Sequence, residues 1–143
     1  MVTVEQLAAY KQLPVDFLRN LDVKDHEGKV LIPYFTETGD FCERHRSRSG
    51  LAAKDNCKWE GQLGLSPSLY GLWSLPEFRQ GKVLGFVEGE SDCWTAWYHK
   101  LPVIGVPGAT MQKLIGKDVL KDIEVVYVLE ENDESQTGSI FVE

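Results

Sequence analysis

Apolar residues in the N-terminal part of the chain have the three- and four-residue spacing of short amphipathic helices. These positions are Val4, Leu7, Ala8, Val15, Leu18 and Leu21. Thr3 and Gln6 stand three residues apart before the first run, which predicts a capping box. Pro14 suits the first position of a second helix because its missing N–H is not needed there.

The next segment alternates between apolar and polar residues, as short strands do. Lys29–Phe35 and Phe41–Arg48 predict a hairpin joined by a turn at Glu37–Asp40. Asp25–Gly28 predicts another turn. A polar segment without period then predicts a loop, and the aromatic segment after it fits either a short strand or a packed turn. These two segments are Ser47–Leu65 and Ser66–Leu75.

After residue 80 the apolar positions form near-continuous runs separated by helical patterns. The predicted elements are strand Lys82–Val87, a helix capped by Ser91, strand Pro102–Val106, helix Thr110–Lys121 and strand Ile123–Leu129. This β-α-β-α-β order with continuously apolar strands predicts a parallel α/β sheet with helices on both faces. We therefore expect two domains, a small α+β domain over residues 1–80 and the parallel sheet over residues 81–143.

Composition and charge narrow the class of protein. The 143 residues include 15 basic and 22 acidic side chains, a net charge of −7, which argues against non-specific nucleic-acid binding over the whole surface. Residues 1–80 hold 10 basic and 11 acidic side chains, whereas residues 81–143 hold 5 and 11. No secretory or membrane-spanning pattern occurs, and three cysteines without C-x-x-C spacing favour a cytoplasmic protein without a disulfide scaffold.

Acidic residues follow the first and third predicted strands. Glu88 and Asp92 follow the first, and Glu131 and Asp133 follow the third. Ligands of parallel sheets bind beyond the carboxyl ends of the strands, and facing carboxylates suit Mg²⁺ or Mn²⁺. The alternative is that these acids are solvated and lie near helix N-termini, where negative charge is mildly favourable.

A row of arginines forms the second candidate site. In the predicted strand Phe41–Arg48, the period of two places Arg44, Arg46 and Arg48 on one face, and Lys58 extends the basic patch. Guanidinium groups at this spacing suit a nucleic-acid backbone or a triphosphate. A solvated strand face is the alternative.

The second half of the sequence resembles a known domain family. G-F-V-E-G-E-S-D at Gly85–Asp92 resembles the first toprim motif, an apolar strand followed by E-G-x-x-D. Leu101–Ala109 is similar to the second toprim strand with its glycine turn, and Val125–Gly138 resembles the strand that carries the D-x-D motif. The similarity is greatest to the toprim domain of DnaG-like primases, especially phage and mobile-element forms, and residues 1–80 resemble the region that precedes it.

This resemblance implies a role for each carboxylate. Glu88 would act as general acid/base or lie close to the metal, and Asp133 would ligate Mg²⁺ (or Mn²⁺). Asp92 would be a further acidic side chain at the metal. Glu131 stands where the family has an aspartate, and its extra methylene changes the ligand geometry.

The implied activity is Mg²⁺-dependent synthesis of RNA primers from NTPs on a single-stranded DNA template. A helicase or another replication domain is the expected partner, and the sequence is expected to end within the toprim domain. Two alternatives stay open: toprim nuclease or topoisomerase chemistry, and a catalytically degenerate toprim that serves as an interaction module. The sequence holds no G-x-x-x-x-G-K-[ST] phosphate loop.

Overall fold

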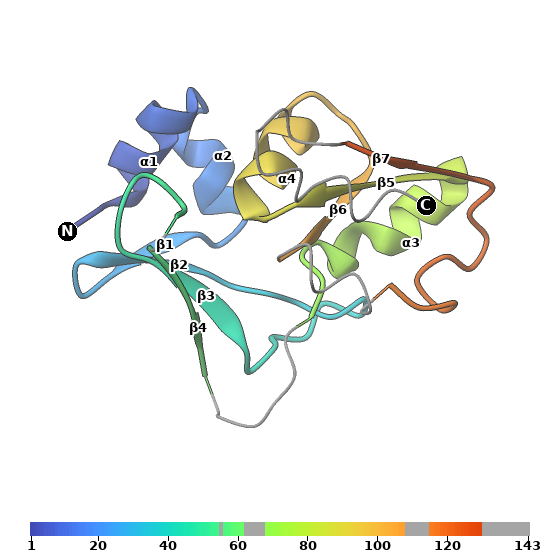
Figure 1. The fold of residues 1–143 in the computed structure, drawn as a ribbon, viewed down its shortest axis with the longest axis horizontal. Coiled ribbons are helices and arrows are strands. Elements are labelled where there is room, and N and C mark those ends of the chain that lie inside the picture. Colours follow the sequence, from blue (N-terminus) through green and yellow to red (C-terminus); the bar gives the residue numbers. More distant parts are fainter. Residues whose placement is uncertain (55, 62–67, 108–114, 130–143) are drawn as a thin grey trace. The chain divides into compact units, whose positions relative to one another are not determined.

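The computed structural model describes residues 1–54, 56–61, 68–107 and 115–129 (Figure 1). The chain divides into two compact units, each with its own sheet. Unit 1 comprises Met1–Tyr34 and Phe41–Pro67, and unit 2 comprises Phe35–Asp40 and Ser68–Glu143. The predicted domain limits at residues 80 and 81 stay a prediction. Among the described residues, no helix has the length and apolar character needed to cross a bilayer.

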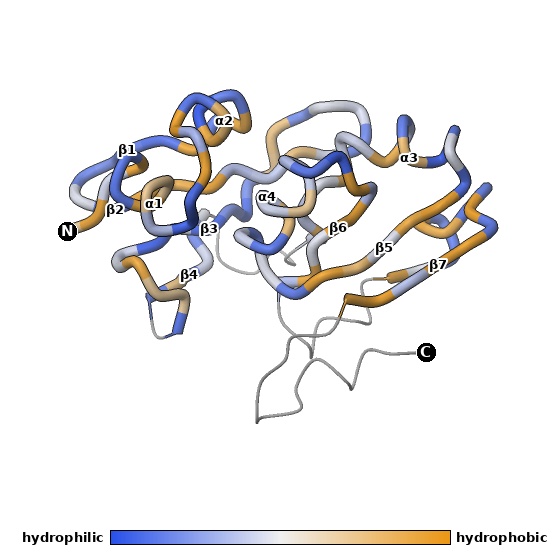
Figure 2. The backbone as a smooth tube through the Cα atoms, turned by 90° about the horizontal axis from the view of Figure 1, so that it is seen from above, coloured by the Kyte–Doolittle hydropathy of each residue, from blue (hydrophilic) through white to orange (hydrophobic). Residues whose placement is uncertain are grey.

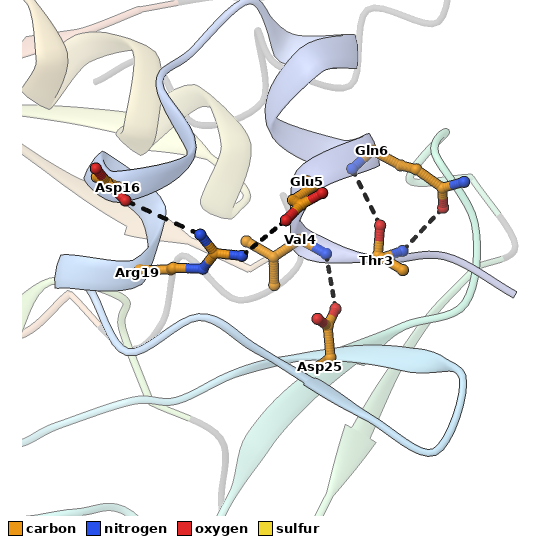
Figure 3. A network of polar contacts seen from close by, with 7 residues as sticks. All are labelled: Thr3, Val4, Glu5, Gln6, Asp16, Arg19 and Asp25. Atoms are coloured by element: carbon orange, nitrogen blue, oxygen red, sulfur yellow. Dashed lines mark hydrogen bonds and ion pairs between the residues drawn. The ribbon is translucent and has the colours of Figure 1, made fainter.

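Unit 1 begins with helix α1 (Val4–Lys11), and its N-terminus confirms the predicted capping box. Gln6 N donates to Thr3 Oγ1 at 3.1 Å, and Thr3 N donates to Gln6 Oε1 at 3.0 Å (Figure 3). Val4 N donates to Asp25 Oδ1 at 2.8 Å. Side chains thereby accept hydrogen bonds from three backbone N–H groups at the start of the helix. Asp25 also connects the helix to the segment Lys24–His26, in which Asp25 lies.

Helix α2 (Val15–Asn20) follows, and Pro14 is its N-cap rather than its first helical residue. The extended φ and ψ of Pro14 (−63° and 137°) place it just outside the helix. Arg19 connects the two helices, because its guanidinium pairs with Glu5 at 3.2 Å and with Asp16 at 3.9 Å (Figure 3). All three side chains are well exposed, so this pairing contributes little to stability.

The sheet of unit 1 is antiparallel, with strand order β1-β2-β3-β4. Its strands are β1 (Lys24–His26), β2 (Lys29–Ile32), β3 (His45–Arg48) and β4 (Cys57–Glu60). The predicted hairpin is confirmed, because β2 pairs with β3 and places Ile32 opposite Arg46.

Two predictions for unit 1 were wrong in part. The predicted turn Asp25–Gly28 contains the end of β1, and the predicted loop Ser47–Leu65 contains β4. Both strands are only three or four residues long and carry few apolar side chains. They are formed by pairing with an existing strand rather than by a periodic pattern of their own.

Unit 2 is built on a parallel sheet of strand order β6-β5-β7. These strands are β5 (Val83–Glu88), β6 (Val103–Val106) and β7 (Val125–Val128). Helix α4 (Glu90–Tyr98) connects β5 to β6. The predicted parallel α/β architecture and all three predicted strands are confirmed.

Helices cover both faces of this sheet, as predicted. On one face, Leu84, Phe86 and Ile104 form a core with Leu75 of α3 (Leu75–Gly81). On the other face, Cys93 of α4 lies against Gly105, where a Cβ would come within 2.7 Å of the Cys93 Sγ. Trp97 Nε1, also from α4, donates to Val103 O at 2.8 Å.

The aromatic segment before α3 is a packed turn. Tyr70 exchanges backbone hydrogen bonds with Gly105 at 2.9 and 2.8 Å, and a single 3₁₀ turn, η1 (Leu72–Ser74), follows. Tyr70 also accepts a hydrogen bond from Trp94 Nε1 at 2.9 Å and contacts Trp97 with ring centroids 5.2 Å apart. The side chain of Trp94 is fully buried in the core.

The predicted helix Thr110–Lys121 is not helical over residues 115–121, and its residues 110–114 lie outside the described part of the chain. Instead, successive turns place Ile115, Val119 and Leu120 against the core of unit 2. Arg79 holds these turns, since its guanidinium donates to Lys121 O and Asp118 O. The predicted helix is therefore wrong over residues 115–121.

Candidate functional site

The E-G-x-x-D segment forms the connection from the central strand β5 to helix α4. Glu88 is the last residue of β5, and Glu90 is the first residue of α4. Gly89 between them has φ 80° and ψ 177°, a conformation that side chains disfavour, and its N–H donates to Val106 O at 2.8 Å. Gly89 is also the N-cap of α4, so the predicted cap Ser91 lies two residues too late.

The order of the strands makes this edge of the sheet the expected ligand site. From β5 the chain crosses through α4 to β6 on one side, and the next strand, β7, pairs with β5 on the other side. The order therefore reverses between β5 and β7, and open α/β sheets bind ligands beyond the carboxyl ends at such a point. Glu88 lies at the carboxyl end of β5, which is one of the two strands that flank this reversal point.

The three described acidic residues of this segment differ in how far they are buried. Glu88 and Asp92 are half-buried, whereas Glu90 is 3% exposed. Burial, followed by the charges of Glu90 and Asp92, raises the pKa of the Cys93 thiol well above its ordinary value. Cys93 is therefore a buried thiol with little tendency to ionise.

Asp92 lines an open pocket of about 380 Å³ that extends along helix α4, from the end of β5 to Leu101 before β6. Its other lining residues are Val87, Thr95, Ala96, His99, Leu101 and Leu129. Leu129 belongs to the same edge, since its N–H donates to Phe86 O at 3.0 Å and extends the β5–β7 ladder. Val87 and Leu129 thus bring one end of the pocket to the carboxyl edge of the sheet.

Glu131 and Asp133 lie outside the described residues, so their predicted meeting with Glu88 stays a prediction. The described chain reaches Leu129, beside β5 at the carboxyl edge. Within the described ranges no group of three or more His, Cys, Asp or Glu side chains could hold a metal ion. Glu88 and Asp92 supply hard oxygen donors of the kind that Mg²⁺ takes, and a complete ligand set requires further donors.

In unit 1, the predicted arginine row lies on one face of the sheet together with Trp59. Arg46 of β3 pairs directly with Trp59 of β4, and its Cζ lies 4.9 Å from the centre of the indole ring. The Cζ of Arg44 lies 5.8 Å from the same ring. The structure therefore brings Arg44 and Arg46 together around an aromatic side chain.

Arg48 has a different environment from the other two arginines. It is 1% exposed, and its Nε donates to Gly50 O at 3.2 Å while its Nη2 donates to Leu51 O. The guanidinium thereby satisfies carbonyl groups of the loop that follows β3. Through these contacts Arg48 holds the loop in place.

Lys58 lies on the opposite face from the arginines. It pairs with Ser47, and adjacent residues of a strand point to opposite faces. Glu60 lies on the Lys58 face and accepts a hydrogen bond from Ser47 Oγ at 2.7 Å. The structure therefore does not join Lys58 to the cluster around Trp59.

Trp59 is the residue that sequence reasoning missed. The polar segment around it predicted a loop, so its pairing with Arg46 was not expected. The alternating residues of Lys58–Glu60, two charged side chains around an aromatic one, were the available signal for a strand. That signal is weak over three residues.

Solved structures of primase domains share the fold of this chain. The structure of a DnaG primase catalytic domain bound to ssDNA matches with a TM-score of 0.65 and 12% identity over 92% of this chain and 54% of that one. The RNA polymerase domain of Mycobacterium tuberculosis primase DnaG matches with a TM-score of 0.55 and 16% identity over 97% of this chain and 49% of that one. The Aquifex aeolicus primase, with its zinc-binding and RNA polymerase domains, matches with a TM-score of 0.57 and 17% identity over 76% of this chain and 28% of that one.

The similarity is one of fold. This chain spans between about a quarter and about half of the length of these three primase structures. No protein-family model matches the sequence, and the search of curated proteins finds no similar sequence. The predicted resemblance to DnaG-like primases is thus confirmed at the level of fold.

Proposed function

We propose that this chain is part of a primase-like nucleotidyltransferase that makes RNA primers on single-stranded DNA. The observation that carries the proposal is the position of Glu88. It ends the central strand of a parallel sheet where the strand order reverses, in a fold shared with primase catalytic domains. Phosphoryl transfer depends on positioning and charge neutralisation, which carboxylates at such an edge can organise.

The proposed division of labour follows the two candidate sites. Glu88, Asp92, Glu131 and Asp133 would hold Mg²⁺ (or Mn²⁺), and Glu88 would also serve as general acid/base. When bound, the ion would neutralise the phosphate charge of the incoming NTP. Gly89 keeps the backbone beside Glu88 free of a Cβ, and no atom of the described residues lies within 4 Å of the position that a Cβ would take.

In unit 1, Arg44 and Arg46 would bind phosphate groups of the template or of the NTP. Lys58 would contribute a separate positive charge on the other face of the sheet. We propose that Arg48 supports the site indirectly by holding the loop after β3, as its two backbone contacts suggest. The wider proposal includes a replication partner such as a helicase and a cytoplasmic location.

The test uses the full-length protein, a single-stranded DNA template, labelled NTPs and Mg²⁺. Glu88→Gln should lower the yield of template-dependent oligonucleotides by at least about a hundredfold, the scale of a lost general acid/base. Glu77→Gln is the matched control, because Glu77 is an exposed acid of α3 in the same unit. Equal activity of the two variants would overturn the role of Glu88.

The same assay separates the proposed function from the second candidate, an interaction module. The glutamate at position 131, where the family has an aspartate, favours that candidate. Saturable Mn²⁺ binding that is lost in Glu88→Gln supports the enzyme. Nucleic-acid binding without metal binding or product would support the interaction module, and shortened DNA without new oligonucleotides would indicate nuclease chemistry.

A further inference from the structure

The arginines on one face of unit 1 differ in how their guanidinium donors are satisfied. Arg48 is buried and donates to two backbone carbonyls, from Gly50 and Leu51. Arg44 also has a buried Nε, but that atom has no hydrogen-bond partner among the described residues. No described group therefore holds this Nε in the way that two carbonyls hold the guanidinium of Arg48.

Trp59 holds Arg44 and the neighbouring Arg46 close together. Both guanidinium carbons lie within 6 Å of the centre of its ring, at 5.8 and 4.9 Å. The indole ring is itself supported by Tyr34, a fully buried residue whose ring centroid lies 5.2 Å away. A guanidinium that stacks on an aromatic ring is restrained, while the N–H donors in its own plane can still reach an acceptor.

The acid next to Trp59 in the sequence does not neutralise this pair. Glu60 lies on the opposite face, where it accepts from Ser47 and pairs with Lys29 at 3.5 Å. Two guanidinium groups close to one ring together offer several N–H donors. The chemistry of the cluster therefore favours an oxyanion such as phosphate, which accepts several N–H donors at once.

We propose that Trp59 is a positioning residue that organises Arg44 and Arg46 into a two-guanidinium site for a phosphate group. This inference rests on the proposed function, which supplies two sources of that group: a phosphodiester of a single-stranded nucleic acid and the triphosphate of an NTP. Trp59 contributes by holding the arginines before the ligand arrives, so that less side-chain entropy is lost on binding.

The test measures binding of a labelled single-stranded oligonucleotide and of a fluorescent NTP analogue to the full chain at several salt concentrations. Arg44→Ala should weaken binding about tenfold and make the salt slope shallower by about 0.7 for a nucleic-acid strand. Trp59→Leu should weaken binding about fivefold although it removes no charge, and Trp59→Phe should retain most of the affinity. Lys24→Ala is the control, because it removes one exposed charge from the opposite face of the same sheet.

A double-mutant cycle separates positioning from general support of the fold. In an Arg44→Ala, Arg46→Ala background, Trp59→Leu should cause no further loss of affinity, because the groups that it positions are gone. A merely structural Trp59 would give the same loss in both backgrounds and would overturn the proposal. Thermal unfolding of Trp59→Phe and Trp59→Leu shows whether both variants are folded.

The two ligands identify the source of the phosphate. Loss of oligonucleotide binding alone assigns the site to the strand, and loss of NTP binding alone assigns it to the triphosphate. If the double arginine variant binds both ligands like the unmodified protein, the site is overturned. The Glu88-dependent primer synthesis would then still stand, so failure of this inference is distinguishable from failure of the proposed function.

Discussion

Two inner strands, β3 in the sheet of unit 1 and β5 in the sheet of unit 2, are opposite in character. β3 has the sequence His-Arg-Ser-Arg, whereas β5 is apolar up to its terminal Glu88 (Figure 2). Both nevertheless contain fully buried side chains, among them Arg48 and Ser47 in β3 and Leu84 in β5.

The difference lies in what makes burial favourable. The interior of β5 is stabilised by the hydrophobic effect, which needs no particular partner. The polar side chains of β3 need specific ones, and Arg48 and Ser47 find them in two loop carbonyls and in Glu60. Substitutions in unit 2 should therefore reveal lost packing, and substitutions in unit 1 should reveal lost hydrogen bonds.

The largest effect should come from the apolar core of unit 2. Phe86→Ala removes a buried ring from the cluster that α3 and the sheet share, and should lower the free energy of unfolding by about 3–5 kcal/mol. Denaturant unfolding measures it. Tyr98→Ala, in an exposed aromatic residue of α4, should change it by less than about 0.5 kcal/mol, and a larger effect there would contradict this account of the core.

The polar strand should respond next. Arg48→Met keeps an unbranched side chain as far as the position of Nε but removes the donors to Gly50 O and Leu51 O, at an expected cost of about 1.5–3 kcal/mol. Arg44→Met is the matched substitution and should cost less than about 1 kcal/mol, because Arg44 Nε has no partner among the described residues. Equal losses in denaturant unfolding would show that the two arginines do not differ.

The helix termini give a smaller contrast. α1 is capped by side chains, while Gly89 caps α4 without a side-chain hydrogen bond. Thr3→Ala should therefore lower the free energy of unfolding by about 1 kcal/mol, and Thr3→Ser should recover most of it. Thermal unfolding of both variants measures the loss. No difference between them would argue against the capping box.

The smallest expected effect is a pH dependence in unit 1. The hydrogen bond from Ser47, together with the charge of Lys29, holds the pKa of Glu60 below its ordinary value. A lowered pKa means that the folded state favours the ionised carboxylate. This stabilisation is complete above the unfolded-state pKa of about 4.3 and is lost as the pH falls through the lowered folded-state pKa.

Urea unfolding across that acidic range tests the effect. The difference in stability between the unmodified protein and Glu60→Gln should shrink as the pH falls below about 4.3. Ser47→Ala removes the largest cause of the lowered pKa and should shrink the same difference. A difference that is constant with pH would contradict the role of Ser47.

Part of the acidic site could be predicted from the sequence. Glu88 and Gly89 were correctly placed at the end of a central parallel strand, because an apolar run followed by a glycine has few structural alternatives. The cap of α4 was wrong by two residues, since Ser91 has the better capping side chain but Gly89 has the φ that the turn needs. The meeting of Glu88 with Glu131 and Asp133 stays a prediction.

The arginine site shows the opposite case. The period of two correctly placed Arg46 and Arg48 on one strand face, but it could not separate an arginine stacked on Trp59 from one buried against a loop. It also could not show that Lys58 lies on the other face, because that depends on how β4 pairs with β3. Short polar strands carry too little pattern to predict their register.

The sequence by itself determined the helix cap at Thr3, the hairpin and the parallel apolar strands of unit 2, because capping geometry and hydrophobic periodicity are local properties. Only the tertiary structure decided that Arg44 and Arg46 lie over the ring of Trp59, that Arg48 binds a loop and that residues 115–121 are not helical. These outcomes depend on which distant groups satisfy each buried donor, and local spacing does not encode those partners.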